Sequence, residues 1–205
     1  ENHRLSPALS FGFEELGRDF VGAKTIRIKN NGHTPATFNV AQVRAAGSPH
    51  TVSLNRTQVT VRGRESTELR VTLTVPVATV APSNLGGLSF REVAGMIEFT
   101  PLSAADNSVI ALRVPYYLAP RSLSDVSTRI GRLSGTDPST VATVTNRNGA
   151  IGGDADFYAW GLEGRRVPGR VSNDVRAVGT QSFDWDGTQQ LMVFAVNTFD
   201  RWSNA

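Results

Sequence analysis

The segment from residue 69 to residue 75 most constrains the fold, because its apolar and polar residues alternate without interruption. Leu69, Val71, Leu73 and Val75 are separated by arginine or threonine at each intervening position. Strict alternation places apolar side chains on one face of a β-strand and polar ones on the other. A strand with one wet face is typical of antiparallel sheets rather than of doubly covered parallel ones. The segment therefore predicts a β-sandwich.

The composition favours the same all-β fold class over the whole chain. The 205 residues include 22 Val and 19 Thr but only 8 Glu and 2 Lys. Valine and threonine suit a pleated, half-buried surface, whereas glutamate and lysine are favoured on exposed helix faces. With 19 Gly and 10 Pro available for turns, the sequence predicts no helix longer than a turn or two.

Shorter alternating segments, bounded by turn residues, predict the remaining strands. Pro115 lies within one of them, and since proline removes a ladder donor, we place it at a sheet edge or a bulge. Residues 76–88 are predicted to form a long loop. For residues 1–20 the sequence does not distinguish a first strand from a tether. The other expected strands cover residues 25–29, 38–40, 52–54, 59–61, 95–99, 109–118, 141–144, 157–160, 174–183 and 191–196.

Two domains are expected. Residues 1–118 supply about seven strands, which matches a fibronectin type III or Ig-like sandwich. Residues 119–128 are polar and short of large apolar side chains, so they are interpreted as a linker. Residues 129–205 form a second β-rich domain whose four or five strands are few for a closed sandwich. We expect this second sandwich to be incomplete at its C-terminus.

Charge and composition exclude several partner classes. The net charge is only +3, and the basic residues are scattered singly instead of forming the patch that a nucleic-acid binder needs. No run approaches the ~18 apolar residues of a membrane span. Cysteine is absent, which excludes disulfides and thiolate chemistry but does not fix the compartment.

The sequence offers little support for catalysis in this chain. A nucleophilic triad needs a histidine base, and His3, His33 and His50 lie near the terminus, in a turn and at a strand start, so each is interpreted as a turn or surface residue. No Gly-x-Ser-x-Gly elbow is present. Zinc is also disfavoured, because no two histidines have ligand spacing.

Two pairs of alternating carboxylates are the candidate metal ligands. Asp154 and Asp156 follow Gly152-Gly153, and Asp184 and Asp186 precede Gly187. Alternate aspartates in a glycine-bearing loop can direct oxygens at one calcium ion. Asp-Gly is also an ordinary turn signal, and the turn reading is preferred. The same carboxylates would serve a glycosidase only beside a sugar cleft.

A dense set of aromatic residues marks the second domain. Alternation puts Tyr158 and Trp160 on one face of a strand and Phe157 on the other, as expected if one side is core. Exposed instead, Tyr158, Trp160 and Trp185 would suit carbohydrate or protein binding. The rest of the set is Phe194, Phe199 and Trp202.

Five segments of the chain carry a resemblance to one known family. Residues 24–32 combine a strand with an Asn-rich turn, and residues 95–99 and 112–117 read as two closing strands with a Val-Pro-Tyr step. In the second domain the segments are residues 174–179 and 193–203. Together they resemble the fibronectin type III-like region that follows the catalytic domain of secreted bacterial subtilisin-like serine proteases, and 193–203 is the most specific match.

The resemblance implies a secreted, non-catalytic accessory region. No catalytic residue carries over, because the Gly-Thr-Ser nucleophile motif is absent. The implied partners are the catalytic domain of the same protease and a protein substrate or cell-surface component. One alternative is a free-standing adhesion or carbohydrate-binding module, and another is an enzyme in its own right. An accessory region should leave an apolar face uncovered, whereas a sugar binder should expose a row of tryptophans.

Overall fold

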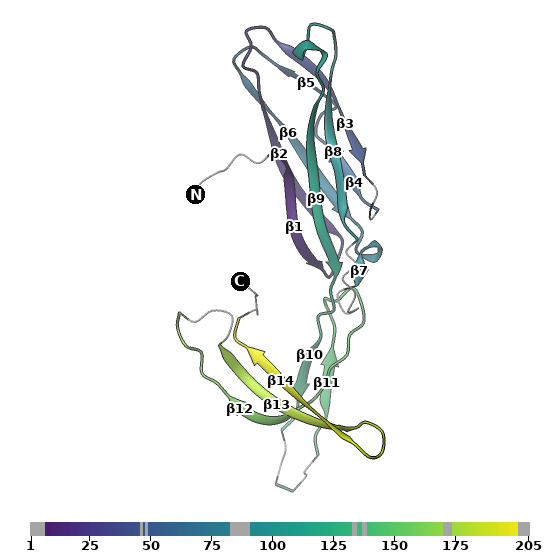
Figure 1. Cartoon of the computed structure of the whole chain (residues 1–205), viewed down its shortest axis with the longest axis vertical. Helices are drawn as coiled ribbons and strands as arrows, with labels where there is room; N and C mark the ends of the chain where they lie inside the picture. The colour runs from purple at the N-terminus through teal and green to yellow at the C-terminus, as the bar shows by residue number, and fades with distance from the viewer. Residues whose placement is uncertain are drawn as a thin grey trace. The chain divides into compact units, whose positions relative to one another are not determined.

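The computed structural model describes residues 7–45, 47, 49–82, 91–132, 135–136, 139–169 and 174–200. Within these ranges the chain is all-β, as predicted, with two short 3-10 turns as its only helical elements (Figure 1). None of the helices described is long and apolar enough to span a membrane. The chain divides into two compact units, residues 1–153 and 154–205, and each is described by itself.

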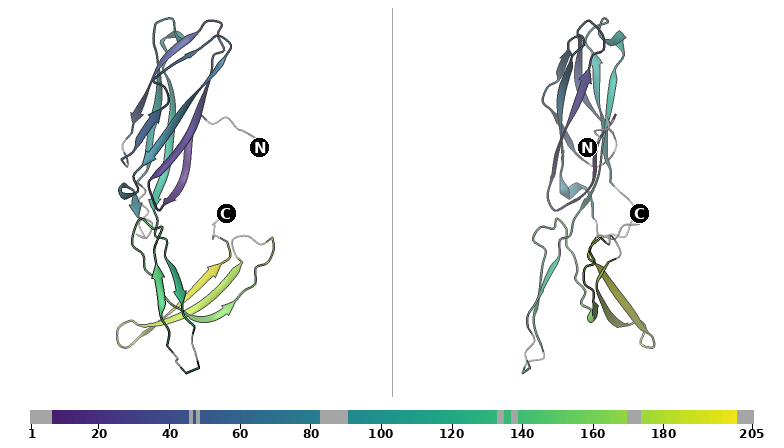
Figure 2. Two further views of the ribbon diagram at one scale, coloured as in Figure 1. Left: turned by 180° about the vertical axis from the view of Figure 1, so that it is seen from behind. Right: turned by 90° about the vertical axis from the view of Figure 1, so that its left-hand side faces the viewer.

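The first unit contains a β-sandwich of two sheets, which face each other in Figure 2. The first sheet has the strand order β1-β9-β8-β3-β5, and β7 pairs with β9 beside this path. Its strands are β1 (Leu9–Leu16), β3 (Ala36–Arg44), β5 (Gln58–Val61), β7 (Ala81–Pro82), β8 (Val93–Pro101) and β9 (Leu112–Ser122). The second sheet has the order β2-β6-β4, with β2 at Phe20–Lys29, β6 at Ser66–Val75 and β4 at Thr51–Leu54.

The alternating segment of β6 forms the centre of the core, which confirms the prediction from residues 69–75. All four of its apolar side chains are fully buried. Opposing residues of the first sheet complete the core, among them Phe38, Phe99 and Tyr116. The rings of Phe38 and Phe99 meet edge to face, with centroids 6.4 Å apart. Burial of these side chains is the main favourable term in the folding of the sandwich.

The position of β9 differs from the edge placement expected for the strand containing Pro115. β9 lies between β8 and β1, so it is an interior strand. It runs antiparallel to β8, where Pro115 is opposite Met96, and parallel to β1. The pairing with β1 begins with Leu9 opposite Tyr116, one residue after the proline. The strand therefore gains its second neighbour only beyond the position that lacks a donor.

Within residues 1–20, which the sequence left undecided between a strand and a tether, the structure contains a strand, β1. Leu9 to Leu16 form a strand parallel to β9, interrupted by a register shift between Ser10 and Phe13. Gly12 lies in this irregularity with φ +84°, a left-handed conformation that glycine adopts without strain. β1 is therefore paired with β9 both before and after the register shift.

The remainder of the first unit is a small hairpin. β10 (Ser127–Ile130) pairs antiparallel with β11 (Ala142–Thr145). Residues 119–122, which were assigned to the linker, continue β9. The predicted domain boundaries at 118 and 128 stay a prediction.

The second unit contains one three-stranded antiparallel sheet in the order β12-β13-β14. Its strands are Ala159–Glu163, Val175–Asp184 and Gln190–Thr198, close to three of the segments that alternation predicted. A register shift separates Trp160 from Leu162. Trp202, the last aromatic of the predicted set, and the end of the 193–203 match lie outside the described residues.

Candidate functional site

His50, which the sequence placed at a strand start, is a buried member of the sandwich core. Its Nε2 lies 2.7 Å from the hydroxyl of Tyr116, which also accepts a hydrogen bond of 2.7 Å from Gln42 Nε2. Sharing one hydroxyl satisfies the buried His50 ring and the partly buried Gln42 amide at once. The His50 ring therefore has a structural role in the core, and the expectation that it is a turn or surface residue is wrong for His50 because its ring is buried against Tyr116.

His33 has a different environment from His50. Its Nε2 lies 2.8 Å from a guanidinium nitrogen of Arg64, and both side chains are exposed. Arg64 itself has φ 63° in the adjoining turn. His33 belongs to this turn-to-turn contact at one end of the sandwich, and His3 lies outside the described residues.

Asp184 and Asp186 organise the turn that joins β13 to β14. Asp184 accepts a 2.7 Å hydrogen bond from the backbone N–H of Gly187. Asp186 Oδ1 accepts three, from the backbone N–H groups of Thr188 and Gln189 and from the Thr188 hydroxyl, at 2.7–2.9 Å. These bonds match the turn role preferred for the pair. They also occupy oxygens that a cation would need.

The calcium prediction for Asp154, Asp156, Asp184 and Asp186 stays a prediction. Asp154 and Asp156 are both exposed, in the segment before β12. In the part of the chain that the structure describes, no three acidic or histidine side chains gather at a distance suited to one metal ion. The test is thermal unfolding with calcium and with chelator, where a calcium-dependent rise in Tm would support ligation.

The hydrogen bonds to Asp186 predict how its carboxyl titrates. The Thr188 hydroxyl, then the Thr188 and Gln189 N–H groups, stabilise the charged form and lower the pKa of Asp186. We expect an NMR titration midpoint below the ~3.9 of an unperturbed aspartate. Because the folded pKa is depressed, these bonds stabilise the turn at neutral pH and are lost as pH falls through that pKa. Asp186→Asn should remove the transition, and a midpoint at or above ~3.9 would contradict the assignment.

The β12-β13-β14 sheet carries apolar side chains on both faces. Residues directly opposite in the register share a face, so Leu162, Val178 and Val196 lie together. Phe194 and Met192 continue this face along β14, and Phe194 is 62% exposed. The other face carries an apolar set of its own, Trp160, Phe183, Leu191 and Val193.

The aromatic candidates are placed by this sheet. Trp160 is 70% exposed on β12 and Trp185 is 69% exposed in the turn after β13. Tyr158 is half-buried, and its Cβ lies against Gly179, where an added methyl group would come within 2.6 Å. The expected burial of one aromatic face is thus not realised within the described residues of this unit. The exposed rings of Trp160 and Trp185 are therefore accessible for either predicted role, protein contact or carbohydrate contact.

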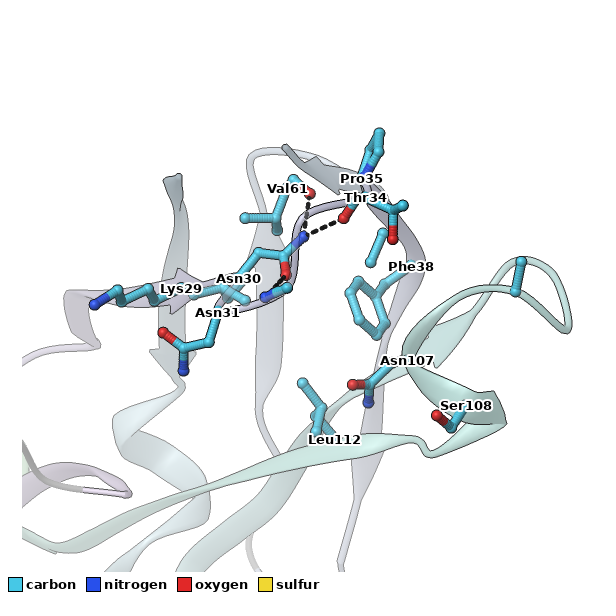
Figure 3. Close-up of a pocket in the computed structure, with 14 residues that line it drawn as sticks. Lys29, Asn30, Asn31, Thr34, Pro35, Phe38, Val61, Asn107, Ser108 and Leu112 are labelled. Atoms are coloured by element: carbon cyan, nitrogen blue, oxygen red, sulfur yellow. Dashed lines mark hydrogen bonds between the residues drawn. The ribbon is translucent and has the colours of Figure 1, made fainter. Parts of the chain in front are cut away.

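A polar cleft of about 400 Å³ opens at one end of the sandwich (Figure 3). One wall is the turn after β2, held by Asn30, whose side chain donates to Thr34 O and Val61 O and accepts from Gly32 N. Phe38 and Leu112 supply apolar surface. These hydrogen bonds use most of the capacity of the Asn30 amide, so its role is to shape the turn.

The opposite wall of this cleft contains a strained turn. Asn107, Ser108 and Val109 have φ of 45°, 52° and 65°, a conformation that is costly for a β-branched residue. Asp106 supports the turn by accepting hydrogen bonds from Thr37 N, Ser103 N and the Ser103 hydroxyl. Beyond its polar composition, this turn has no signal in the sequence.

Comparison with known proteins yields likenesses of structure alone. No family model and no curated protein matches the chain. Among solved structures, a PapD-like domain of human CEP192 is 10% identical and covers 58% of this chain and 91% of its own, with a TM-score of 0.38. The Escherichia coli chaperone DraB is 14% identical, covering 56% and 53%, with a TM-score of 0.34.

A third likeness extends over more of the chain. The CsuC–CsuE chaperone–tip adhesion subunit complex of Acinetobacter baumannii is 8% identical and covers 93% of this chain and 95% of the matched one, with a TM-score of 0.36. The chain is a β-sandwich module. Its function has to be argued from its own residues.

Proposed function

We propose that this chain is the non-catalytic region that follows the catalytic domain of a secreted bacterial subtilisin-like serine protease. Its role is to brace that domain and to position protein substrate or cell-surface contacts. The proposal rests on the resemblance of residues 24–32, 95–99, 112–117, 174–179 and 193–203 to that region. The β-strands at these segments are consistent with the opening and closing strands that the resemblance implies.

The observation that carries the proposal is the uncovered sheet of the second unit. Phe194 and Met192 on one face of this sheet, and Trp160 on the other face, are each more than 60% exposed. An isolated three-stranded sheet gains little stability from one partly filled face, and exposed apolar patches mark contact surfaces. Such a surface is expected of a region that packs against further polypeptide. Covering it would contribute roughly 25 cal/mol for each Å² of apolar surface.

The proposal assigns catalysis to a separate domain. In this chain His50 is committed to the core through Tyr116, and His33 contacts an arginine. Neither arrangement resembles the serine–histidine–carboxylate chain that activates a nucleophile. We therefore expect the purified chain to hydrolyse no casein, while the full gene product does so and loses activity with a serine-protease inhibitor. Inhibitor-sensitive hydrolysis by the purified chain would contradict the assignment.

The coding sequence on both sides of the chain tests the context directly. An Asp, a His and a Gly-Thr-Ser motif upstream of Glu1, in the same reading frame, are the expected result. A signal peptide joined directly to Glu1 would end the protease proposal.

A second candidate function is carbohydrate binding, favoured by the exposure of Trp160 and Trp185. Aromatic rings offer an apolar face for stacking. If this reading holds, Trp160→Ala should abolish retardation of the protein in polysaccharide gels, while Trp185→Ala separates a one-ring site from a two-ring site. Unchanged migration of the unaltered chain in such gels would exclude it.

A further inference from the structure

A second cleft, of about 570 Å³, lies where the sandwich meets the loop after β11. Gly17, in the turn between β1 and β2, is packed so closely on this loop that an added Cβ would lie 2.0 Å from the carbonyl oxygen of Asn148. The turn and the loop therefore touch backbone to backbone. Only glycine permits so close an approach at position 17.

Hydrogen bonds hold the two sides of this contact together. Leu123 donates to Leu16 O at 2.8 Å, and its own carbonyl accepts from the N–H groups of Ala150 and Ile151. Asn146 accepts from Asp125 N and donates to Ile151 O. The cleft is thus built on a backbone that is tied to β1 on one side and to the 146–151 loop on the other. Little reorganisation would be needed for a ligand to bind.

Two arginines line the cleft, one from each side. Arg18 follows Gly17, and Arg147 precedes Asn148, so each is one residue from the backbone contact. Neither guanidinium takes part in an ion pair or hydrogen bond with the residues that the structure describes. The other lining residues are Gly17, Leu123 and Asn148. The lining therefore holds two positive charges and no carboxylate.

The nearby acidic groups lie outside this lining. Asp125 accepts a 3.0 Å hydrogen bond from Asn148 Nδ2, and Asp19 accepts one from Val77 N. Glu14, Glu15 and Asp19 line a neighbouring hollow that Arg18 also borders. These carboxylates reduce the long-range potential at the cleft, so a ligand has to contact the arginines directly.

We propose that this cleft binds a carboxylate of a partner polypeptide between Arg18 and Arg147. Two guanidinium-bearing residues border the same cleft, and guanidinium N–H groups provide paired donors that match carboxylate oxygens in charge-assisted bonds stronger than neutral ones. Leu123 offers apolar surface to the methylene groups of an aspartate or glutamate side chain. The binding site itself is independent of the proposed function, which supplies only the identity of the partner, the catalytic domain or its protein substrate.

The test is an NMR titration of the full 205-residue chain with the acetylated, amidated peptide Glu-Glu, and with Gln-Gln as the uncharged match. Glu-Glu should shift the backbone amide signals of residues 16–19 and 147–149, and Gln-Gln should not. Arg18→Gln and Arg147→Gln should each weaken binding about three- to fivefold, the range of a solvent-exposed ion pair. Raising the salt concentration should weaken it further.

Arg56→Gln is the matched control, since Arg56 is an exposed arginine elsewhere on the same sandwich and its replacement should leave binding unchanged. Equal shifts with Gln-Gln, or equal weakening by Arg56→Gln, would overturn the proposal. Binding of inorganic phosphate at these residues without binding of Glu-Glu would overturn it as well. All of these readouts use the isolated chain, so they are separate from the outcome of the gene-context experiment.

Discussion

Phe99→Ala should lower the free energy of unfolding of the sandwich by about 3–5 kcal/mol, the range for a buried phenylalanine. The side chain is 1% exposed on β8, and in the register it lies between Val40 of β3 and Leu112 of β9. Its ring meets Phe38 edge to face. Truncation removes the buried surface and leaves a cavity between two sheets that cannot close without disturbing their pairing.

Denaturant unfolding followed by fluorescence or circular dichroism measures this loss. Leu102→Ala is the matched control, because Leu102 directly follows β8 and is 52% exposed; its replacement should cost less than ~1 kcal/mol. Equal effects of the two substitutions would show that Phe99 is not in the core. The m-value should be unchanged if both variants unfold from the same compact state.

Gly95→Ala should destabilise the sandwich by about 1–3 kcal/mol through overpacking. Gly95 on β8 is directly opposite Tyr116 on β9. An added Cβ would lie 2.2 Å from the Tyr116 hydroxyl oxygen and 2.7 Å from the carbonyl oxygen of Val43. The Tyr116 hydroxyl that lies next to Gly95 forms the hydrogen bonds to His50 and Gln42. The added methyl group would therefore displace this hydroxyl and disturb both hydrogen bonds.

Tyr116→Phe completes the test as a double-mutant cycle. Alone it should cost about 1–3 kcal/mol, because the buried His50 ring and the partly buried Gln42 amide lose their common partner. Combined with Gly95→Ala, the total should be smaller than the sum: the ring carbon Cζ still lies 2.5 Å from the added Cβ, but the hydrogen bonds of the hydroxyl cannot be lost twice. Gly152→Ala, where an added Cβ has nothing within 4 Å, should be nearly neutral. Strict additivity of the two core substitutions would contradict the contact.

The sequence was most informative where one strand face is buried. Residues 69–75 reveal both the strand and its buried side, because a period of two can satisfy only a half-buried strand. The same reasoning located β2, β3, β8, β13 and β14 to within a few residues. For Pro115 the edge expectation holds only locally, because β9 is an interior strand whose second neighbour begins at the next residue.

The candidate sites were less predictable. Arginines such as Arg18 and Arg147 were interpreted as scattered solvated residues, and they are 129 positions apart in the chain. Their proximity depends on the contact between Gly17 and the carbonyl of Asn148, which no local pattern encodes. The aromatic residues of the second unit carry a strand signal, but the same alternation is compatible with a buried or an exposed face.

The sequence by itself determined the all-β class, most strand positions and the buried faces of the sandwich, because local sterics and apolar periodicity act between residues close in the chain. Only the tertiary structure decided the parallel pairing of β1 with β9, the shared hydroxyl of Tyr116, and the meeting of two arginines in one cleft. Each of these depends on segments far apart in the sequence. Such contacts form when the whole chain buries its apolar surface, so their geometry is a property of the packed fold.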